Sequence, residues 1–214
     1  DVYENNPKKE EIGILSPMHL DGSEKLLDRH FEVYLARNTQ NNRIFSNVFL
    51  NDLKESYEVD FINAAHWMLP KKTIEEIGGF SPYFFHGAED YDYVNRMKYF
   101  GKKILVCPQS KVVHDAIQDY HQQQTENALK QHRTSLQMQR ETRYLNPNLP
   151  FNIESEKSEF YSNILKLALK GKFDESQFYI NQYQYFKKKF AEISSIRKTA
   201  ITEKHAFLNL SEKL

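Results

Sequence analysis

The clearest periodic pattern in the chain lies between residues 89 and 101. Its apolar residues share one helical face at i, i+1, i+4 and i+7 spacing: Tyr93, Val94, Met97 and Phe100. Asp92 and Arg96 lie off that face, and Gly101 is a typical stop. The pattern predicts an amphipathic helix that begins at Glu89.

Residues 71–77 have the pattern of a short helix that Gly78 and Gly79 terminate. Between residues 21 and 58 the chain is polar and loop-rich. We expect one short helix there, built on a small apolar set: Phe45, Val48, Phe49 and Leu53.

Strands are predicted by two apolar runs that follow the helix. Residues 103–108 form the first run, which ends at Pro108, and residues 111–114 form the second. They predict a strand, a turn and the end of a second strand, with His114 as the last residue.

The chain changes character after residue 115. Residues 116–144 are rich in glutamine and contain no glycine or proline, which predicts an exposed or partner-covered helix. The segment 146–150 holds two prolines and two asparagines and is a clear break. We therefore predict two regions, 1–145 and 146–214.

The second region is predicted to be helical. A helix over 156–169 ends at Gly171, and the next begins at Asp174 or Ser176. Its apolar seam steps by four and three residues: Tyr179, Tyr183, Phe186, Phe190 and Ile193. The seam suits packing on the preceding helix or on a second copy in a homo-oligomer. The basic run 187–189 is either a solvated face or a peripheral contact with anionic lipid.

Bulk composition removes several function classes. The formal net charge is 0, from 29 basic and 29 acidic residues, which gives no electrostatic basis for nucleic-acid binding. The single cysteine excludes an internal disulfide and fits a reducing, cytoplasmic compartment. The sequence contains no run of about 18 apolar residues, so it predicts no membrane span.

Candidate chemistry lies at the start of the 89–101 helix. Glu89 and Asp90 fall in the first turn, where the helix dipole favours anionic side chains and is expected to lower the pKa of Asp90. A rigidly aimed, ionised carboxylate can act as a general base. The alternative is that both acids are capping residues and that Asp92 and Arg96 form an i,i+4 ion pair.

His114 is the second candidate. A histidine at a strand end beside carboxylates can bind Mn²⁺ or Mg²⁺. A lone histidine is more often structural, so spacing alone favours the structural role over the metal role.

These segments together resemble a known family. The matching residues occur in the family's order over about residues 10–116: Gly78-Gly79-Phe80, Phe84-Phe85, Glu89-Asp90-Tyr91-Asp92, Arg96, Gly101 and Val113-His114. Gly13 to Pro17 and Val59 to Pro70 are similar to two of its strands. The chain resembles the C-terminal half of family-two inverting glycosyltransferases, of the kind that transfer rhamnose or galactofuranose.

The resemblance implies an α/β fold: the C-terminal half of a GT-A fold, here followed by a helical appendage. It implies a nucleotide-diphosphate sugar as donor and a glycan or lipid-linked acceptor. Asp90 would be the catalytic base and Glu89 would help to bind the acceptor. His114 would complete the site of a divalent Mn or Mg ion.

Five further residues are assigned to substrate binding or its support. Asp92 and Arg96 would hold the helix and the glycine loop in place. The Gly79 backbone would allow a sugar to approach closely. His66 and Trp67 would line the acceptor pocket at the end of a strand, although a core tryptophan is the commoner case.

The family's nucleotide-binding half, with its DxD-type motif, has no counterpart here, so we expect this chain by itself to be inactive. Three functions remain open. The first is an inverting, metal-dependent sugar transferase of bacterial polysaccharide or glycoconjugate assembly, cytoplasmic or peripheral at the inner membrane face. The second is a non-catalytic carbohydrate-binding or assembly module. The third is another metal-assisted transferase or hydrolase that uses Asp90 and His114 as ligands.

Overall fold

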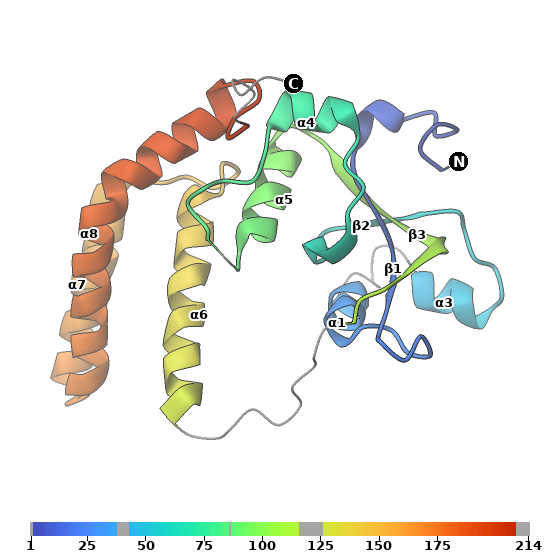
Figure 1. Cartoon of the computed structure of the whole chain (residues 1–214). Helices are drawn as coiled ribbons and strands as arrows, with labels where there is room; N and C mark the ends of the chain where they lie inside the picture. Colours follow the sequence, from blue (N-terminus) through green and yellow to red (C-terminus); the bar gives the residue numbers. More distant parts are fainter. Residues whose placement is uncertain (1, 38–42, 86, 116–125, 209–214) are drawn as a thin grey trace.

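The computed structural model describes residues 2–37, 43–85, 87–115 and 126–208. It is a mixed α/β structure in which a small sheet with short helices precedes three long helices (Figure 1). The GT-A architecture stays a prediction.

The sheet has the strand order β1-β3-β2. Strand β1 (Ile12–Leu20) pairs parallel with β3 (Lys103–Val113), and β2 (Tyr57–Val59) pairs antiparallel with β3. The predicted turn at Pro108 is wrong, because β3 runs on as one strand. Its partners jump from Cys107 to Lys111, so a bulge accommodates the proline.

The strand expected over 59–70 is also wrong. Only β2 is a strand there, and the backbone then curls into the 3₁₀ helix η2 (Ala64–His66). Met68 forms an isolated antiparallel bridge with Leu15, and their backbones exchange two hydrogen bonds of 2.8 and 3.0 Å. His66 therefore lies on a turn rather than at a strand end.

Helices cover one face of the sheet. Helix α4 (Lys71–Ile77) and helix α5 (Glu89–Tyr99) form where the periodicity predicts them. Helix α3 (Ile44–Phe49) is the short helix expected in the polar region, but Leu53 lies beyond it, and Ile44 is buried instead of the exposed Phe45, Val48 and Phe49. Their buried side chains join those of the strands in one core, which includes Ile14, Ile44, Ile77, Tyr93, Met97, Ile104 and Val106.

Helix α1 (Arg29–Arg37) falls in the stretch predicted to be loop-rich. Only Phe31 and Leu35 of this helix are buried, one turn apart, so its apolar pattern is short. The opposite face of the sheet carries a smaller cluster, and Val2 and Tyr3, ahead of the 3₁₀ helix η1 (Lys9–Glu11), pack against it.

The three long helices are α6 (Glu126–Leu145), α7 (Ile153–Leu169) and α8 (Phe173–Thr202). They share a second core of mostly aromatic side chains, which includes Phe84, Tyr144, Leu145, Phe160, Phe186, Phe190 and Ile193. The seam of α8 thus packs within the chain, on the preceding helices. Because α6 contributes to this core, the helical cluster begins before the boundary predicted at residue 146. Residues 116–125 of the predicted 116–144 helix lie outside the described residues.

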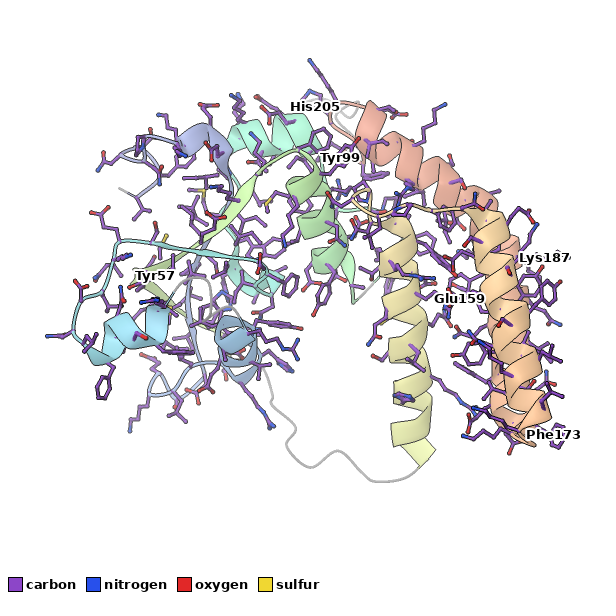
Figure 2. The ribbon with its side chains drawn as sticks, turned by 180° about the vertical axis from the view of Figure 1, so that it is seen from behind. Tyr57, Tyr99, Glu159, Phe173, Lys187 and His205 are labelled. Atoms are coloured by element: carbon purple, nitrogen blue, oxygen red, sulfur yellow. The ribbon has the colours of Figure 1, made fainter. Side chains whose placement is uncertain are left out.

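The end of the chain returns to the sheet region. Figures 1 and 2 show the end of α8, with His205 just beyond it, on the side of the molecule that carries α4 and α5. The Gly79 N–H donates a hydrogen bond of 2.9 Å to the Ala206 carbonyl. Gly78 has a φ of +89°, and a Cβ there would lie 1.9 Å from the same carbonyl oxygen. The glycine loop is therefore shaped to fit the C-terminal segment.

No helix in the described parts of the chain combines the length and the apolar character needed to cross a membrane.

Candidate functional site

The first turn of α5 presents the two predicted catalytic acids. Glu89 and Asp90 are both half-buried. The Tyr91 N–H donates a 2.7 Å hydrogen bond to Asp90 Oδ1. The backbone N–H of Ala64 approaches the same carboxylate closely enough to favour its charged form. Asp90 is therefore held between α5 and η2.

The pKa of Asp90 is raised, whereas the sequence predicts that the helix N-terminus lowers it. Burial raises the pKa of Asp90 above its usual value, and the charge of Glu89 raises it further, whereas the surrounding N–H groups oppose the rise only in part. A raised pKa makes the carboxylate a stronger base than an exposed aspartate.

Three histidines meet on the other side of η2. His19 lies near the carboxyl end of β1, His114 follows β3, and His66 belongs to η2. Their ring centroids lie 5.4 Å apart for His19 and His66, 5.8 Å for His66 and His114, and 6.3 Å for His19 and His114. The parallel pairing of β1 and β3 brings two of these rings to one edge of the sheet.

The turn η2 thus connects the two predicted site residues. Its first residue, Ala64, faces Asp90, and its last residue, His66, contacts His114. The base candidate and the metal-ligand candidate therefore flank one three-residue turn.

Asp28 holds His114 in place. Its Oδ2 lies 3.1 Å from His114 Nδ1, and its Oδ1 accepts a 2.9 Å hydrogen bond from the Phe31 N–H as the cap of α1. The side chain is fully buried. Burial alone would raise the pKa of Asp28, but the Phe31 N–H and His114 outweigh it and hold the pKa below its usual value. The ionised carboxylate accepts the Nδ1 proton of His114 and leaves Nε2 with a free lone pair.

His19 is fixed in the opposite tautomer. The Ser16 hydroxyl donates to the Pro17 carbonyl at 3.0 Å, so its oxygen is free to accept from His19 Nε2 at 3.3 Å. The remaining nitrogen, Nδ1, is buried without a hydrogen-bond partner. Burial, with the neighbouring His66 and His114, lowers the pKa of His19 to about 4, so the ring is neutral near pH 7.

Four buried polar side-chain atoms in the described residues lack a hydrogen-bond partner: His19 Nδ1, Asn63 Oδ1, Trp67 Nε1 and Glu89 Oε2. All four belong to β1, to the residues flanking η2, or to the start of α5. Such atoms are rare in native proteins and are costly unless a ligand or an ordered water satisfies them. Their grouping makes this region the candidate site for a polar ligand or for ordered water.

Asp92 and Arg96 have a supporting position. They are 2% and 0% exposed, although the sequence places both off the apolar face of the helix. Arg96 Nε donates to Asp92 at 2.9 Å, as the i,i+4 spacing predicts. Its other two nitrogens donate to the carbonyls of Ile77 at 3.1 Å and Gly79 at 2.6 Å. The pair anchors the glycine loop to α5 and is shielded from a dissolved substrate.

Gly79 and Trp67 also have defined neighbours. A Cβ on Gly79 would lie 3.0 Å from atoms of Phe207 and Leu208. The C-terminal segment therefore lies where the family resemblance implies a closely approaching sugar. Trp67 is half-buried and stacks on Phe80 with centroids 6.3 Å apart. His66, in contrast, is exposed.

The histidine cluster offers few ligands for a divalent ion. In the described part of the chain, no three His, Cys, Asp or Glu side chains are grouped so that they could hold a metal ion. His114 alone fits as one ligand, because a carboxylate on the far ring nitrogen is the usual support of a metal-bound histidine. Other ligands would have to come from the substrate or from outside these residues.

Sequence analysis missed Asp28 and His19. Asp28 precedes Phe31 and Leu35 at the spacing of a helix cap with its first apolar residues, which is a usable signal. His19 ends a strand as His114 does, but only the strand pairing shows that the two ends are neighbours.

Replacing Asp28 by asparagine is expected to reverse the His114 tautomer. Oδ1 of the asparagine stays on the Phe31 N–H, because asparagine and aspartate cap helices about equally well. The amide nitrogen then replaces Oδ2 and donates to Nδ1, which moves the ring proton to Nε2. Long-range ¹H–¹⁵N correlation spectra of the imidazoles measure this directly.

The matched control for the tautomer measurement is the His19 ring, which should keep its Nε2 proton in Asp28→Asn.

Asp28→Ala removes the helix cap as well as the contact with His114, and it should lower the free energy of unfolding by about 1 kcal/mol. An unchanged His114 tautomer in Asp28→Asn would show that Asp28 does not orient this ring.

No family model, no curated protein and no solved structure matches the chain in the three comparisons with known proteins.

Proposed function

We propose that this chain is the acceptor-side part of an inverting glycosyltransferase that uses a nucleotide-diphosphate sugar. The observation that carries the proposal is the connection through η2. Asp90 contacts its first residue and His114 its last, so a base and a metal-binding imidazole flank the same turn. The order of the sequence motifs supports the same reading.

Each residue has a defined role in this proposal. Asp90 takes the proton of the acceptor hydroxyl as its oxygen attacks the anomeric carbon, while the bond from that carbon to the diphosphate oxygen breaks. The raised pKa of Asp90 suits this transfer. Glu89 Oε2, buried and without a partner, is a ready acceptor for a second hydroxyl of the same sugar.

The leaving diphosphate requires charge neutralisation. Asp28 holds the proton of His114 on Nδ1, so the lone pair of Nε2 is available. Nε2 would be one protein ligand of a Mn²⁺ or Mg²⁺ ion. Such an ion, when bound, supplies Lewis-acid stabilisation of the departing phosphate oxygen. The role of the protein is to fix the direction of the imidazole lone pair.

The fold in this proposal is the C-terminal half of a GT-A domain. The parallel pair of β1 and β3 supports it, since the site lies at the carboxyl ends of these strands. We place the activity in bacterial glycan assembly in the cytoplasm, where a lipid-linked acceptor would bring the protein to the inner membrane face.

The test is a donor screen with Mn²⁺ on the full-length product of the gene. A panel of nucleotide-diphosphate sugars is combined with glycan and lipid-linked acceptors. Release of the nucleoside diphosphate reports transfer, and NMR of the product reports the anomeric configuration. Inverted product supports the proposal. Retained configuration, or no diphosphate release with any donor, contradicts it.

A further inference from the structure

A pocket of about 440 Å³ lies next to Asp90, between the sheet region and the helical cluster. Tyr34 of α1 and Tyr91 of α5 form one wall, and Ser135, Met138, Gln139 and Thr142 of α6 form the other. Figure 1 shows α1 and α6 on opposite sides of the first turn of α5. The volume of the pocket falls within the usual range of small-molecule sites, about 300–1,000 Å³.

The aromatic wall is rigid. The Tyr91 ring stacks on Phe61 with centroids 4.1 Å apart and an interplanar angle of 5°. The Tyr91 hydroxyl donates to the Tyr34 hydroxyl at 3.0 Å, and the Tyr34 ring meets Phe61 edge-on at 4.8 Å. Tyr91 stays 36% exposed. A partly exposed ring held in this way offers a flat surface for the C–H face of a sugar.

The wall from α6 adds hydrogen-bonding groups without charge. Gln139 Nε2 donates to Ser135 Oγ at 3.4 Å, and the Thr142 hydroxyl donates to the Met138 carbonyl at 2.8 Å. Among the described residues, no side chain that lines the pocket is ionisable near neutral pH; the Arg37 guanidinium, 5.6 Å from the centroid of the Tyr34 ring, is outside the lining. The lining therefore suits a neutral polyol better than a phosphate or a nucleotide.

The position of the pocket relates it to the base. Tyr91 follows Asp90 and donates its N–H to that carboxylate, yet Asp90 itself turns toward η2 and is absent from the pocket lining. The first turn of α5 thus has two faces, one toward the histidines and one toward α6. An acceptor whose reacting sugar lies at Asp90 would extend past Tyr91.

We propose that this pocket binds a neutral sugar unit of the acceptor glycan, next to the unit that receives the transferred sugar. The role as an acceptor subsite rests on the proposed transferase function. Binding of a saccharide there does not, and it can be measured without turnover.

The test uses the 214-residue chain labelled with ¹³C in its methionine methyl groups. The chain has four methionines, and Met138 lines this pocket whereas Met97 is buried in the core of the sheet region. Cellobiose, lactose, chitobiose and methyl α-rhamnoside are titrated in turn. At least one should shift the Met138 signal with saturation and leave Met97 unchanged.

Two variants localise the binding. Ser135→Trp fills the pocket and should weaken the affinity of the responding sugar about tenfold or more, equivalent to about 1.4 kcal/mol. Leu136→Trp is the matched control, because Leu136 is exposed on the same helix and does not line the pocket. The affinity of this variant for the responding sugar should stay within about twofold of wild type. Gln139→Ala repeats the test without added bulk and should also weaken binding.

The outcomes separate the two proposals. If no sugar shifts the Met138 signal, the sugar pocket is wrong, whatever the donor screen shows. If a sugar binds but the donor screen yields no transfer, the pocket stands and the transferase function falls. Equal loss of affinity in Ser135→Trp and Leu136→Trp would place the sugar elsewhere.

Discussion

Asp90→Asn in the full-length protein is expected, on the proposed transferase function, to lower sugar transfer by about 10²–10⁴-fold, the usual contribution of a general base. The amide keeps the size of the carboxylate and can still accept the 2.7 Å hydrogen bond from the Tyr91 N–H. It cannot take a proton from the acceptor hydroxyl at neutral pH. The loss should therefore appear in kcat, while binding of the nucleotide sugar is retained.

The pH profile of the unaltered enzyme gives an independent readout. In the proposed mechanism transfer requires the ionised form of Asp90, so kcat/KM should fall as the pH drops through the pKa of this group. Because burial and Glu89 raise that pKa, the acid limb should lie above the ordinary aspartate value of about 3.9. An acid limb at or below that value would argue against Asp90 as the titrating base.

Asp60→Asn is the matched control for Asp90→Asn. The Asp60 side chain is 71% exposed and forms a 3.8 Å surface ion pair with Lys98. Loss of this ion pair should leave the rate of transfer within about twofold of wild type, since exposed ion pairs contribute little to stability. If Asp90→Asn behaves like Asp60→Asn, Asp90 is not the base, and the capping role considered for the two acids becomes the better account.

The parts of the fold that the sequence predicts well are those with long periodic patterns. The helix from Glu89 and the seam of α8 each present apolar residues over several turns. Helix α1 buries only Phe31 and Leu35, which is too short a pattern to stand out from a polar loop. Residues 59–70 are apolar enough for a strand, but beyond β2 only Met68 pairs with β1, and Ala64 to His66 turn instead.

The candidate site divides in the same way. Asp90, Glu89 and His114 follow from the order of local motifs. The histidine contacts depend on the register of β1 against β3 and on the bulge at Pro108, which no local pattern contains. The Gly78-Gly79 loop shows a second limit: its glycines mark a close approach correctly, but only the fold shows that the C-terminal segment makes it.

Arg96→Ala is expected to lower the free energy of unfolding by about 3–5 kcal/mol, the usual cost of removing one partner of a buried ion pair. The change leaves the Asp92 carboxylate, 2% exposed, without its counter-charge. It also removes the donors to the carbonyls of Ile77 and Gly79. The guanidinium lies 5.1 Å from the centroid of the Phe207 ring, so the contact with the C-terminal segment is weakened as well.

Urea unfolding at pH 7 measures the effect, with Lys98→Ala as the control on the same helix. Lys98 is partly exposed and pairs only with Asp60, so its loss should cost about 0–1 kcal/mol. Asp92→Asn combined with Arg96→Met should be more stable than Arg96→Ala, because no buried charge then remains unpaired. If the double variant loses as much stability as Arg96→Ala, the unpaired Asp92 charge does not cause the loss, and the hydrogen bonds to the carbonyls of Ile77 and Gly79 account for it. If Arg96→Ala loses no more than Lys98→Ala, the pair with Asp92 does not anchor the glycine loop.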